Sequence, residues 1–128
     1  MSVVAPALPA SKLSGRHILI VEDEMLIALY LADMLTALGC TSMTAARVAK
    51  AVPLATNERF DAAIVDMNLA GEPGHPVAEA LSRRGVPFVI ATGYGIEGIT
   101  PDHRYRPILP KPYLPEQVEA ALLKLLST

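Results

Sequence analysis

Short runs of β-branched and apolar residues alternate with helix-period segments along most of the chain, and this alternation is the feature that most constrains the fold. The runs typical of buried strands are 17–21, 41–45, 60–66, 86–91 and 108–109. The segments with helical periodicity are 22–38, 46–56, 77–84 and 115–126, with one further weak helix near 94–101. Strands that alternate with helices predict an α/β fold, in which helices cover both faces of a parallel sheet.

The predicted sheet is doubly wound and has five strands. The common order for five such strands is 2-1-3-4-5, the flavodoxin-like arrangement. The pair Ile108-Leu109 lies between two prolines, and a strand with proline at both ends belongs at a sheet edge. We therefore expect the last strand to lie at an edge.

Glycine and proline give several local expectations. Gly39 is suited to the left-handed conformation that closes the first helix. Pro53 should bend or end the second helix, because proline lacks the amide donor of a helix interior. The cluster 71–76 (G-E-P-G-H-P) has the composition of a loop, and Pro76 suits the first turn of the helix that follows.

Composition narrows the class of protein. The 128 residues give room for one domain, which we expect over residues 16–128 after a flexible tail at 1–15. Hydrophobic residues make up 52% of the chain, enough to build a sizeable core. The formal net charge of −2 lacks the positive surplus of nucleic-acid-binding proteins, so we expect no nucleic-acid partner.

The setting of the protein is inferred from what the sequence lacks. Its apolar runs are shorter than the roughly 18 residues of a membrane span, so no membrane partner is expected. Cys40 is the only cysteine and cannot form an internal disulfide, which is typical of a reducing, cytoplasmic setting.

Polar residues stand where the predicted strands end. Glu22 and Asp23 follow the first strand, and Asp66 ends the third. Thr92 follows the fourth strand, and Lys111 follows the fifth. Because the carboxyl ends of parallel strands meet at one edge of the sheet, these side chains should share one crevice.

The chemistry of this crevice indicates phosphoryl transfer. Three carboxylates close together raise one another's pKa unless a cation neutralises them. Oxygen ligands without Cys or His favour magnesium or a similar hard cation. A carboxylate nucleophile, a metal, a hydroxyl and a lysine are together typical of a phosphoryl-transfer site.

Four motifs carry a resemblance to a known family. They are I-L-I-V-E-D-E at 18–24, I-V-D-M-N at 64–68, A-T-G-Y-G at 91–95 and L-P-K-P-Y at 109–113. In this order they make the chain, from about Arg16 onward, resemble the receiver domains of two-component response regulators. The resemblance implies that Asp66 accepts a phosphoryl group from a histidine kinase or histidine phosphotransfer protein.

The same resemblance implies roles for the other residues. The magnesium ligands would be Glu22, Asp23, Asp66 and the backbone carbonyl of Asn68. Thr92 and Lys111 would each contact a phosphoryl oxygen, and Lys111-Pro112 would be a cis peptide. The protein would catalyse only its own phosphorylation and dephosphorylation, so it would not otherwise be an enzyme.

The chain is most similar to a subgroup of stand-alone receivers whose fourth strand ends in Phe-Ala-Thr-Gly-Tyr, although Ile90 replaces the Phe here. Typical receivers also carry a Tyr or Phe switch residue three positions before the lysine, where this chain has Ile108. Because the segment 93–105 is rich in glycine, we expect it to respond to phosphorylation instead, with Tyr94 as the reporter.

A receiver that fills the chain must signal through protein contacts. On the first helix Ile27, Leu31, Met34 and Leu38 follow the helical period and should face the sheet. Leu26, Leu29, Tyr30 and Ala37 leave further apolar surface, which could dock the kinase or phosphotransfer protein or could be covered by the last helix. We expect a monomer or weak dimer with a downstream protein target.

Other functions fit less well. An aspartyl-nucleophile phosphatase needs an acid two residues after the nucleophile, where Asn68 stands. A flavodoxin-like nucleotide binder needs a glycine-rich phosphate loop where the acidic run 22–24 stands. The remaining alternative is a receiver-fold interaction module that does not depend on phosphorylation.

Overall fold

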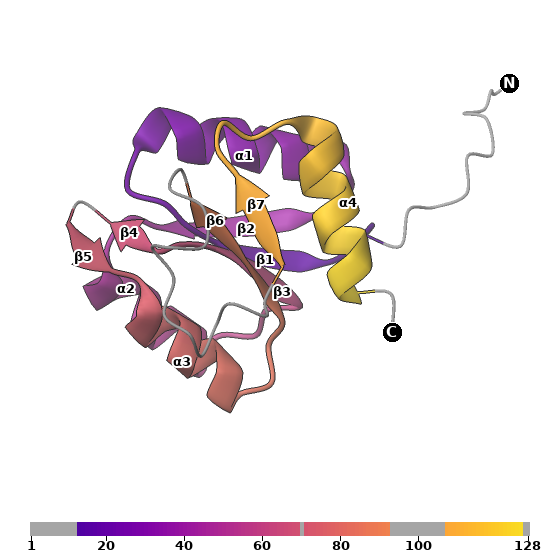
Figure 1. The fold of residues 1–128 in the computed structure, drawn as a ribbon. Helices are drawn as coiled ribbons and strands as arrows, with labels where there is room; N and C mark the ends of the chain where they lie inside the picture. The colour runs from indigo at the N-terminus through magenta and orange to yellow at the C-terminus, as the bar shows by residue number, and fades with distance from the viewer. Residues whose placement is uncertain (1–12, 70, 93–106, 127–128) are drawn as a thin grey trace, which may run out of the picture.

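The central feature of the fold is a five-stranded parallel sheet. The structure, a computed structural model, describes residues 13–69, 71–92 and 107–126. The strands of the sheet are β1 (His17–Val21), β2 (Thr41–Ala45), β3 (Ala62–Asp66), β6 (Phe88–Thr92) and β7 (Ile108–Pro110). They lie in the order β2-β1-β3-β6-β7 (Figure 1), which confirms the predicted order 2-1-3-4-5 and the edge position of the last strand.

Within the described residues, two helices cover each face of the sheet. The elements α1 (Met25–Ala37) and α4 (Pro115–Leu126) lie on one face, and α2 (Val48–Asn57) and α3 (His75–Arg83) lie on the other (Figure 1). The helix positions agree with the predicted ones to within a few residues. Pro76 stands in the first turn of α3, as expected.

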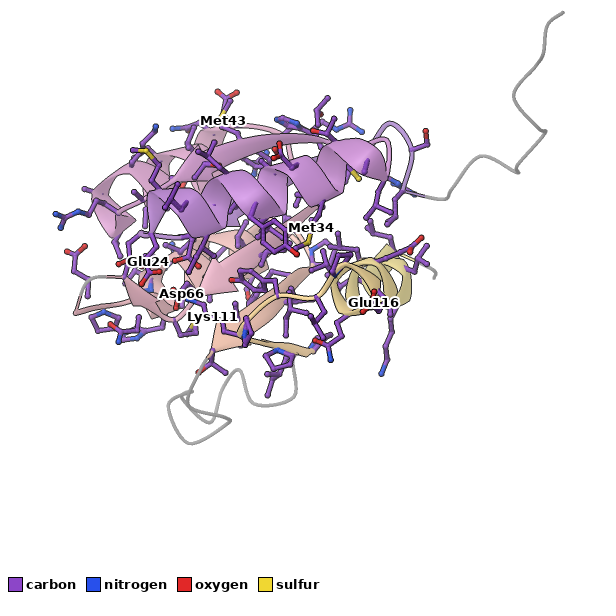
Figure 2. The ribbon with its side chains drawn as sticks, turned by 90° about the horizontal axis from the view of Figure 1, so that it is seen from above. Glu24, Met34, Met43, Asp66, Lys111 and Glu116 are labelled. Atoms are coloured by element: carbon purple, nitrogen blue, oxygen red, sulfur yellow. The ribbon has the colours of Figure 1, made fainter. Side chains whose placement is uncertain are left out.

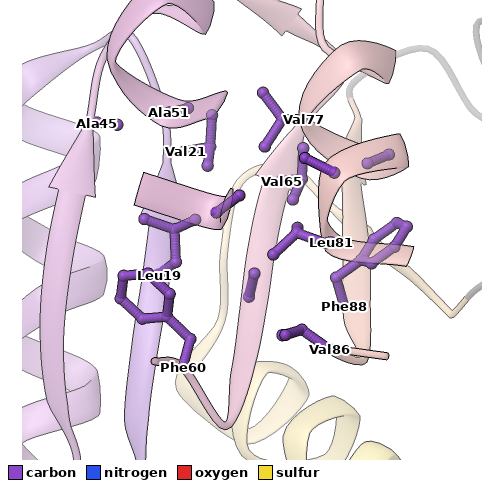
Figure 3. Packing of buried hydrophobic residues seen from close by; sticks show 14 of the residues in the cluster. Leu19, Val21, Ala45, Ala51, Phe60, Val65, Val77, Leu81, Val86 and Phe88 are labelled. Carbon is purple, nitrogen blue, oxygen red and sulfur yellow. The ribbon is translucent and has the colours of Figure 1, made fainter. Parts of the chain in front are cut away.

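The core is split by the sheet into two hydrophobic clusters, because successive side chains of a strand point to opposite faces. Leu19, Val65 and Phe88 point toward α2 and α3 and pack with Leu81 (Figure 3). On the other face Ile18, Ile20, Ile64 and Val89 pack with residues of α1 and α4. Burial on both faces explains the continuous apolar runs of the central strands.

The segment that follows β3 differs from the predicted loop. A short antiparallel hairpin forms between β4 (Asn68–Leu69) and β5 (Glu72–Pro73), and α3 begins directly after it at His75. Gly71 turns the hairpin with a φ of +88°, and its amide donates to Oδ1 of Asn68 at 3.0 Å. The prediction that 71–76 is only a loop was therefore wrong.

Helix α2 does not end at Pro53 but continues to Asn57. Pro53 is exposed, so its ring faces solvent, whereas Ala51 and Ala55 are buried against the sheet. The guanidinium of Arg84 donates hydrogen bonds to the carbonyls of Ala55 and Glu58, which satisfies acceptors at the end of the helix. Packing and this cap outweigh the amide donor that proline lacks.

The residues just before β1 belong to the folded unit. Leu13 is fully buried, and the amide of Gly15 donates to the carbonyl of Gly39 at 2.8 Å. Gly39 has a φ of +87°, the left-handed conformation predicted for it. The rest of the expected tail, 1–12, lies outside the described residues, as do the weak helix at 94–101 and the segment 93–105. In the part of the chain that the structure describes, no helix is long and apolar enough to cross a membrane.

Candidate functional site

The predicted site residues lie at the carboxyl edge of the sheet. Glu22 and Asp23 directly follow β1, and Asp66 is the last residue of β3. Thr92 ends β6, and Lys111 follows β7. Figure 2 shows Asp66 and Lys111 close together at this edge.

Three carboxylates form a cluster there. One oxygen from each of Glu22, Asp23 and Asp66 lies within 4.8 Å of the other two. Glu22 and Asp66 are buried, whereas Asp23 is half-buried. This set of oxygen donors, reachable from solvent at Asp23, fits a hard divalent cation such as magnesium.

Lys111 is the cation of the cluster. Its Nζ lies 2.6 Å from Oδ2 of Asp66 and 3.0 Å from Oε1 of Glu22. Burial alone would lower the pKa of Lys111, but the hydrogen bonds to Asp66 and Glu22 outweigh burial and raise it, so the side chain stays charged. The Lys111-Pro112 peptide is cis, which confirms that prediction.

The cluster has more acidic than basic groups, because three carboxyl groups face one ammonium group. Burial raises the pKa of Glu22, and the amide of Glu24 and the ammonium of Lys111 only partly oppose this effect. A bound cation would relieve both the repulsion and the burial of charge.

Asp66 is also held from the side of the hairpin. The amide of Asn68 donates to Oδ1 of Asp66 at 2.9 Å. A Cβ atom on Gly74 would lie 2.5 Å from the carbonyl oxygen of Asp66 and 3.0 Å from Cα of Met67, so only glycine lets the chain approach β3 this closely. That the backbone carbonyl of Asn68 is a metal ligand stays a prediction.

Thr92 occupies the predicted position, and its role stays a prediction. It is buried at the end of β6, and its carbonyl oxygen accepts the amide of Lys111 at 3.3 Å. This backbone bond fixes the start of the Lys111 side chain relative to β6.

Two residues of the site were not identified from the sequence, and they are Gly74 and Tyr113. The hydroxyl of Tyr113 donates to Oε1 of Glu22 at 3.3 Å. Burial, together with the carboxylates of Glu22 and Asp66, raises the pKa of Tyr113, so the hydroxyl remains a donor. Tyr113 belongs to the motif L-P-K-P-Y, but no local pattern indicates its partner 91 residues away.

The first turns of α1 present an apolar surface beside the cluster. Its exposed residues are Met25, Leu26, Leu29 and Tyr30, which we call the α1 surface. Leu31 and Met34 are buried, and Ile27 and Leu38 are half-buried, in line with the predicted inward face. Because Leu26 is 81% exposed and Tyr30 is 49% exposed, the last helix does not cover this surface.

A cavity of about 330 Å³ connects the α1 surface to the carboxylates. Met25 and Leu29 line it together with Glu22, Asp23 and Arg47. A molecule that enters this cavity from the α1 surface would therefore lie next to Glu22 and Asp23.

Comparisons with known proteins agree with this geometry. The response regulator receiver domain model matches residues 18–122. SdrG from Sphingomonas melonis, in its solution structure, is 44% identical over 90% of this chain and 98% of its own, with a TM-score of 0.78. The REC domain of the Erythrobacter litoralis PhyR response regulator is 29% identical over 89% of this chain and 92% of its own, with a TM-score of 0.76.

A third solved structure shares the fold at lower identity. The receiver domain of the sensor histidine kinase PA1611 from Pseudomonas aeruginosa, with a magnesium ion in its active-site cleft, is 23% identical over 90% of this chain and 100% of its own, with a TM-score of 0.75. A search of curated proteins found no match. From the family match and the likeness to SdrG, the chain belongs to the family of response regulator receiver domains.

Proposed function

We propose that this receiver is a stand-alone phosphoacceptor of a two-component phosphorelay. Asp66 would take a phosphoryl group from a histidine kinase or histidine phosphotransfer protein in the presence of Mg²⁺, and the protein would signal through protein contacts. One observation carries the proposal: the Asp66 carboxylate, 2.6 Å from Lys111 Nζ, lies in a cluster with Glu22 and Asp23 that has surplus negative charge.

The residues of the cluster divide the work of phosphoryl transfer. Mg²⁺ held by Glu22, Asp23, Asp66 and the carbonyl of Asn68 would supply charge neutralisation for the transferred group. A carboxylate oxygen of Asp66 would form the bond to phosphorus as the bond to the donor's histidine nitrogen breaks.

Two further side chains would serve the phosphoryl group once it is on Asp66. Lys111 already contacts Oδ2 of Asp66, so a small movement of Nζ would pair it with a phosphoryl oxygen. Thr92 lies at the end of the neighbouring strand and would contact a second oxygen.

The α1 surface supports a docking site for the phosphodonor protein. Its four apolar residues are exposed next to the cavity that leads to Glu22 and Asp23. Large exposed apolar residues gathered beside a functional site are typical of protein interaction surfaces. We propose that a helix of the kinase or phosphotransfer protein packs on this surface, so that its histidine reaches Asp66.

Finer assignments follow from the sequence. The run Ala91-Thr92-Gly93-Tyr94 supports membership of the Phe-Ala-Thr-Gly-Tyr subgroup of stand-alone receivers. The buried, unpaired Cys40 thiol suits the reducing conditions of the cytoplasm. The protein would act as a monomer or weak dimer and catalyse only its own phosphorylation and dephosphorylation.

A labelling experiment tests the proposal. The full chain is incubated with a small acyl phosphate, with Mg²⁺ or with a chelator, and also with phosphorylated candidate kinases. We expect a covalent phosphoryl group that is lost in alkali, as an acyl phosphate should be, and that needs the divalent cation. A chain that takes no label from any of these donors would instead be a receiver-fold module that does not depend on phosphorylation.

A further inference from the structure

The hydroxyl of Tyr113 is a polar group placed inside an otherwise apolar cluster. The residue is 3% exposed and belongs to the hydrophobic cluster that also includes Ile20, Ile64, Ala91 and Val118. Packing alone does not require the hydroxyl, since phenylalanine has the same ring. A buried hydroxyl costs free energy unless it finds a hydrogen-bond partner, and the partner here is Oε1 of Glu22.

The donors to Glu22 show why this contact matters. Oε1 accepts from Lys111 at 3.0 Å and from Tyr113 at 3.3 Å, while Oε2 accepts the amide of Glu24 at 3.2 Å. A carboxylate oxygen accepts about two hydrogen bonds, so Oε1 is filled and Oε2 keeps a position that a cation can use. The side chain of Glu22 is fully buried, so solvent does not replace a missing donor.

Lys111 is a shared donor, whereas Tyr113 is not. Nζ of Lys111 lies closer to Asp66, at 2.6 Å, than to Glu22, at 3.0 Å. In the proposed phosphorylated state, Lys111 pairs with a phosphoryl oxygen, so its hydrogen bond to Glu22 weakens. The Tyr113 hydroxyl is fixed by the packing of its ring and remains on Oε1.

We propose that Tyr113 is a positioning residue for the metal site: its hydroxyl orients the buried Glu22 carboxylate toward the cation, whether or not Lys111 contacts it. Tyr113 touches no reacting atom and acts through Glu22. The inference rests on the proposed function for the Mg²⁺ site and for the movement of Lys111. Hydrogen-bond partners of metal-binding side chains commonly strengthen metal binding by one to two orders of magnitude.

A magnesium titration of the unphosphorylated full chain tests the inference without any phosphotransfer. Tyr113→Phe keeps the ring and removes only the hydroxyl. We expect its Mg²⁺ dissociation constant, followed by amide chemical shifts at the ends of β1 and β3, to rise about tenfold. The matched control is Thr36→Val, which removes a hydroxyl that donates to Ala32 within α1 at 3.0 Å, and its dissociation constant should not change.

The dependence of phosphorylation on Mg²⁺ gives a second readout. With a small phosphodonor, Tyr113→Phe should need about tenfold more Mg²⁺ for half-maximal rate, yet reach a rate within about twofold of the wild type at saturation. A purely structural role would lower thermal stability without moving the half-saturation point. Thermal unfolding in the absence of Mg²⁺ shows whether the variant is folded under the conditions of the titration.

Three results would overturn the inference. They are an unchanged dissociation constant in Tyr113→Phe, a rate loss that persists at saturating Mg²⁺, and an equal change in Thr36→Val. The proposed function fails separately. A wild-type chain that binds Mg²⁺ but takes no phosphoryl group would refute it, while the tenfold difference in Mg²⁺ binding would still support the role of Tyr113.

Discussion

The two ends of strand β3 carry aspartates in very different surroundings. Asp61, just before the strand, accepts the amide of His17 at 2.8 Å and pairs with the guanidinium of Arg16 at 3.5 Å. Asp66, at the other end, shares one lysine with Glu22 in a cluster that also contains Asp23. The Asp61 carboxylate is paired with one cation, Arg16. At the other end of β3, three carboxyl groups face a single cation, Lys111.

This difference distinguishes a structural charge, at Asp61, from the charge of the proposed functional site at Asp66. A paired, partly exposed aspartate such as Asp61 contributes a little stability, and its charge is already neutralised by its partner. In the cluster around Asp66, burial raises the pKa of Glu22 even with Lys111 beside it, and the nearby Asp66 charge adds to this effect. Surplus charge in a buried position supports the proposal that a cation binds there.

The largest expected effect comes from removing the nucleophile. Asp66→Asn should abolish phosphoryl labelling completely, because an amide cannot form the acyl phosphate. The matched variant Asp61→Asn changes the aspartate at the opposite end of β3 and should label like the wild type. Phosphoryl label from a small phosphodonor is measured in both variants by gel or by mass. A labelled Asp66→Asn protein would contradict the assignment of Asp66 as the phosphoacceptor.

Removing the surplus charge should have the next largest effect. Glu22→Gln combined with Asp23→Asn leaves Asp66 and Lys111 balanced, as Asp61 and Arg16 are. We expect Mg²⁺ binding to weaken about 100-fold and phosphorylation to slow, since two of the proposed ligands are lost. The fold should survive, because the change relieves repulsion. An unaltered magnesium titration, measured by calorimetry, would remove the metal from this edge.

A variant of the α1 surface tests whether the phosphodonor protein docks beside the carboxyl edge of the sheet. Tyr30→Ala should slow transfer from a kinase or phosphotransfer protein about tenfold, as expected for an aromatic interface residue. Labelling by a small phosphodonor should remain normal.

The control for Tyr30→Ala is Met43→Ala. Met43 is an exposed apolar residue of β2 that lies on the other side of α1 from Asp66 in Figure 2. Phosphotransfer rates from one kinase to the wild type, Tyr30→Ala and Met43→Ala show whether Tyr30 takes part in docking. Equal loss with both phosphodonors in Tyr30→Ala would mean that the residue supports the fold and not docking.

The smallest expected effect comes from changing Asp61, whose charge is paired with that of Arg16. Asp61→Asn should lower the free energy of unfolding by about 1 kcal/mol, because it weakens one hydrogen bond and one partly exposed ion pair. Urea unfolding measures the change. A loss several times larger would show that the Asp61 carboxylate contributes far more than one partly exposed ion pair, and that the comparison overstates the difference between the two ends of β3.

The sheet and the main site residues could be predicted because both follow from local patterns. Continuous apolar runs mark buried parallel strands, and Glu22, Asp66 and Lys111 directly follow or end such runs. Parallel topology then brings these strand ends to one edge without any long-range information.

The features that were missed depend on contacts between distant or closely packed segments. The hairpin of β4 and β5 is followed by Gly74, which packs closely against the backbone of Asp66. The hydrogen bond from Tyr113 to Glu22 spans 91 residues. None of these is visible in periodicity or local composition, because each is decided by tertiary packing.

The most direct test of the account locates the phosphoryl group within one peptide. Cleavage after Arg59 and Arg83 releases residues 60–83, which contain both Asp61 and Asp66. Protein labelled by a small phosphodonor with Mg²⁺ is reduced with borohydride, which converts an aspartyl phosphate to homoserine, and the peptide is sequenced by fragmentation. The account predicts homoserine at Asp66 alone, and only when Mg²⁺ was present. Homoserine at Asp61, or none in wild-type protein that carries label, would contradict it.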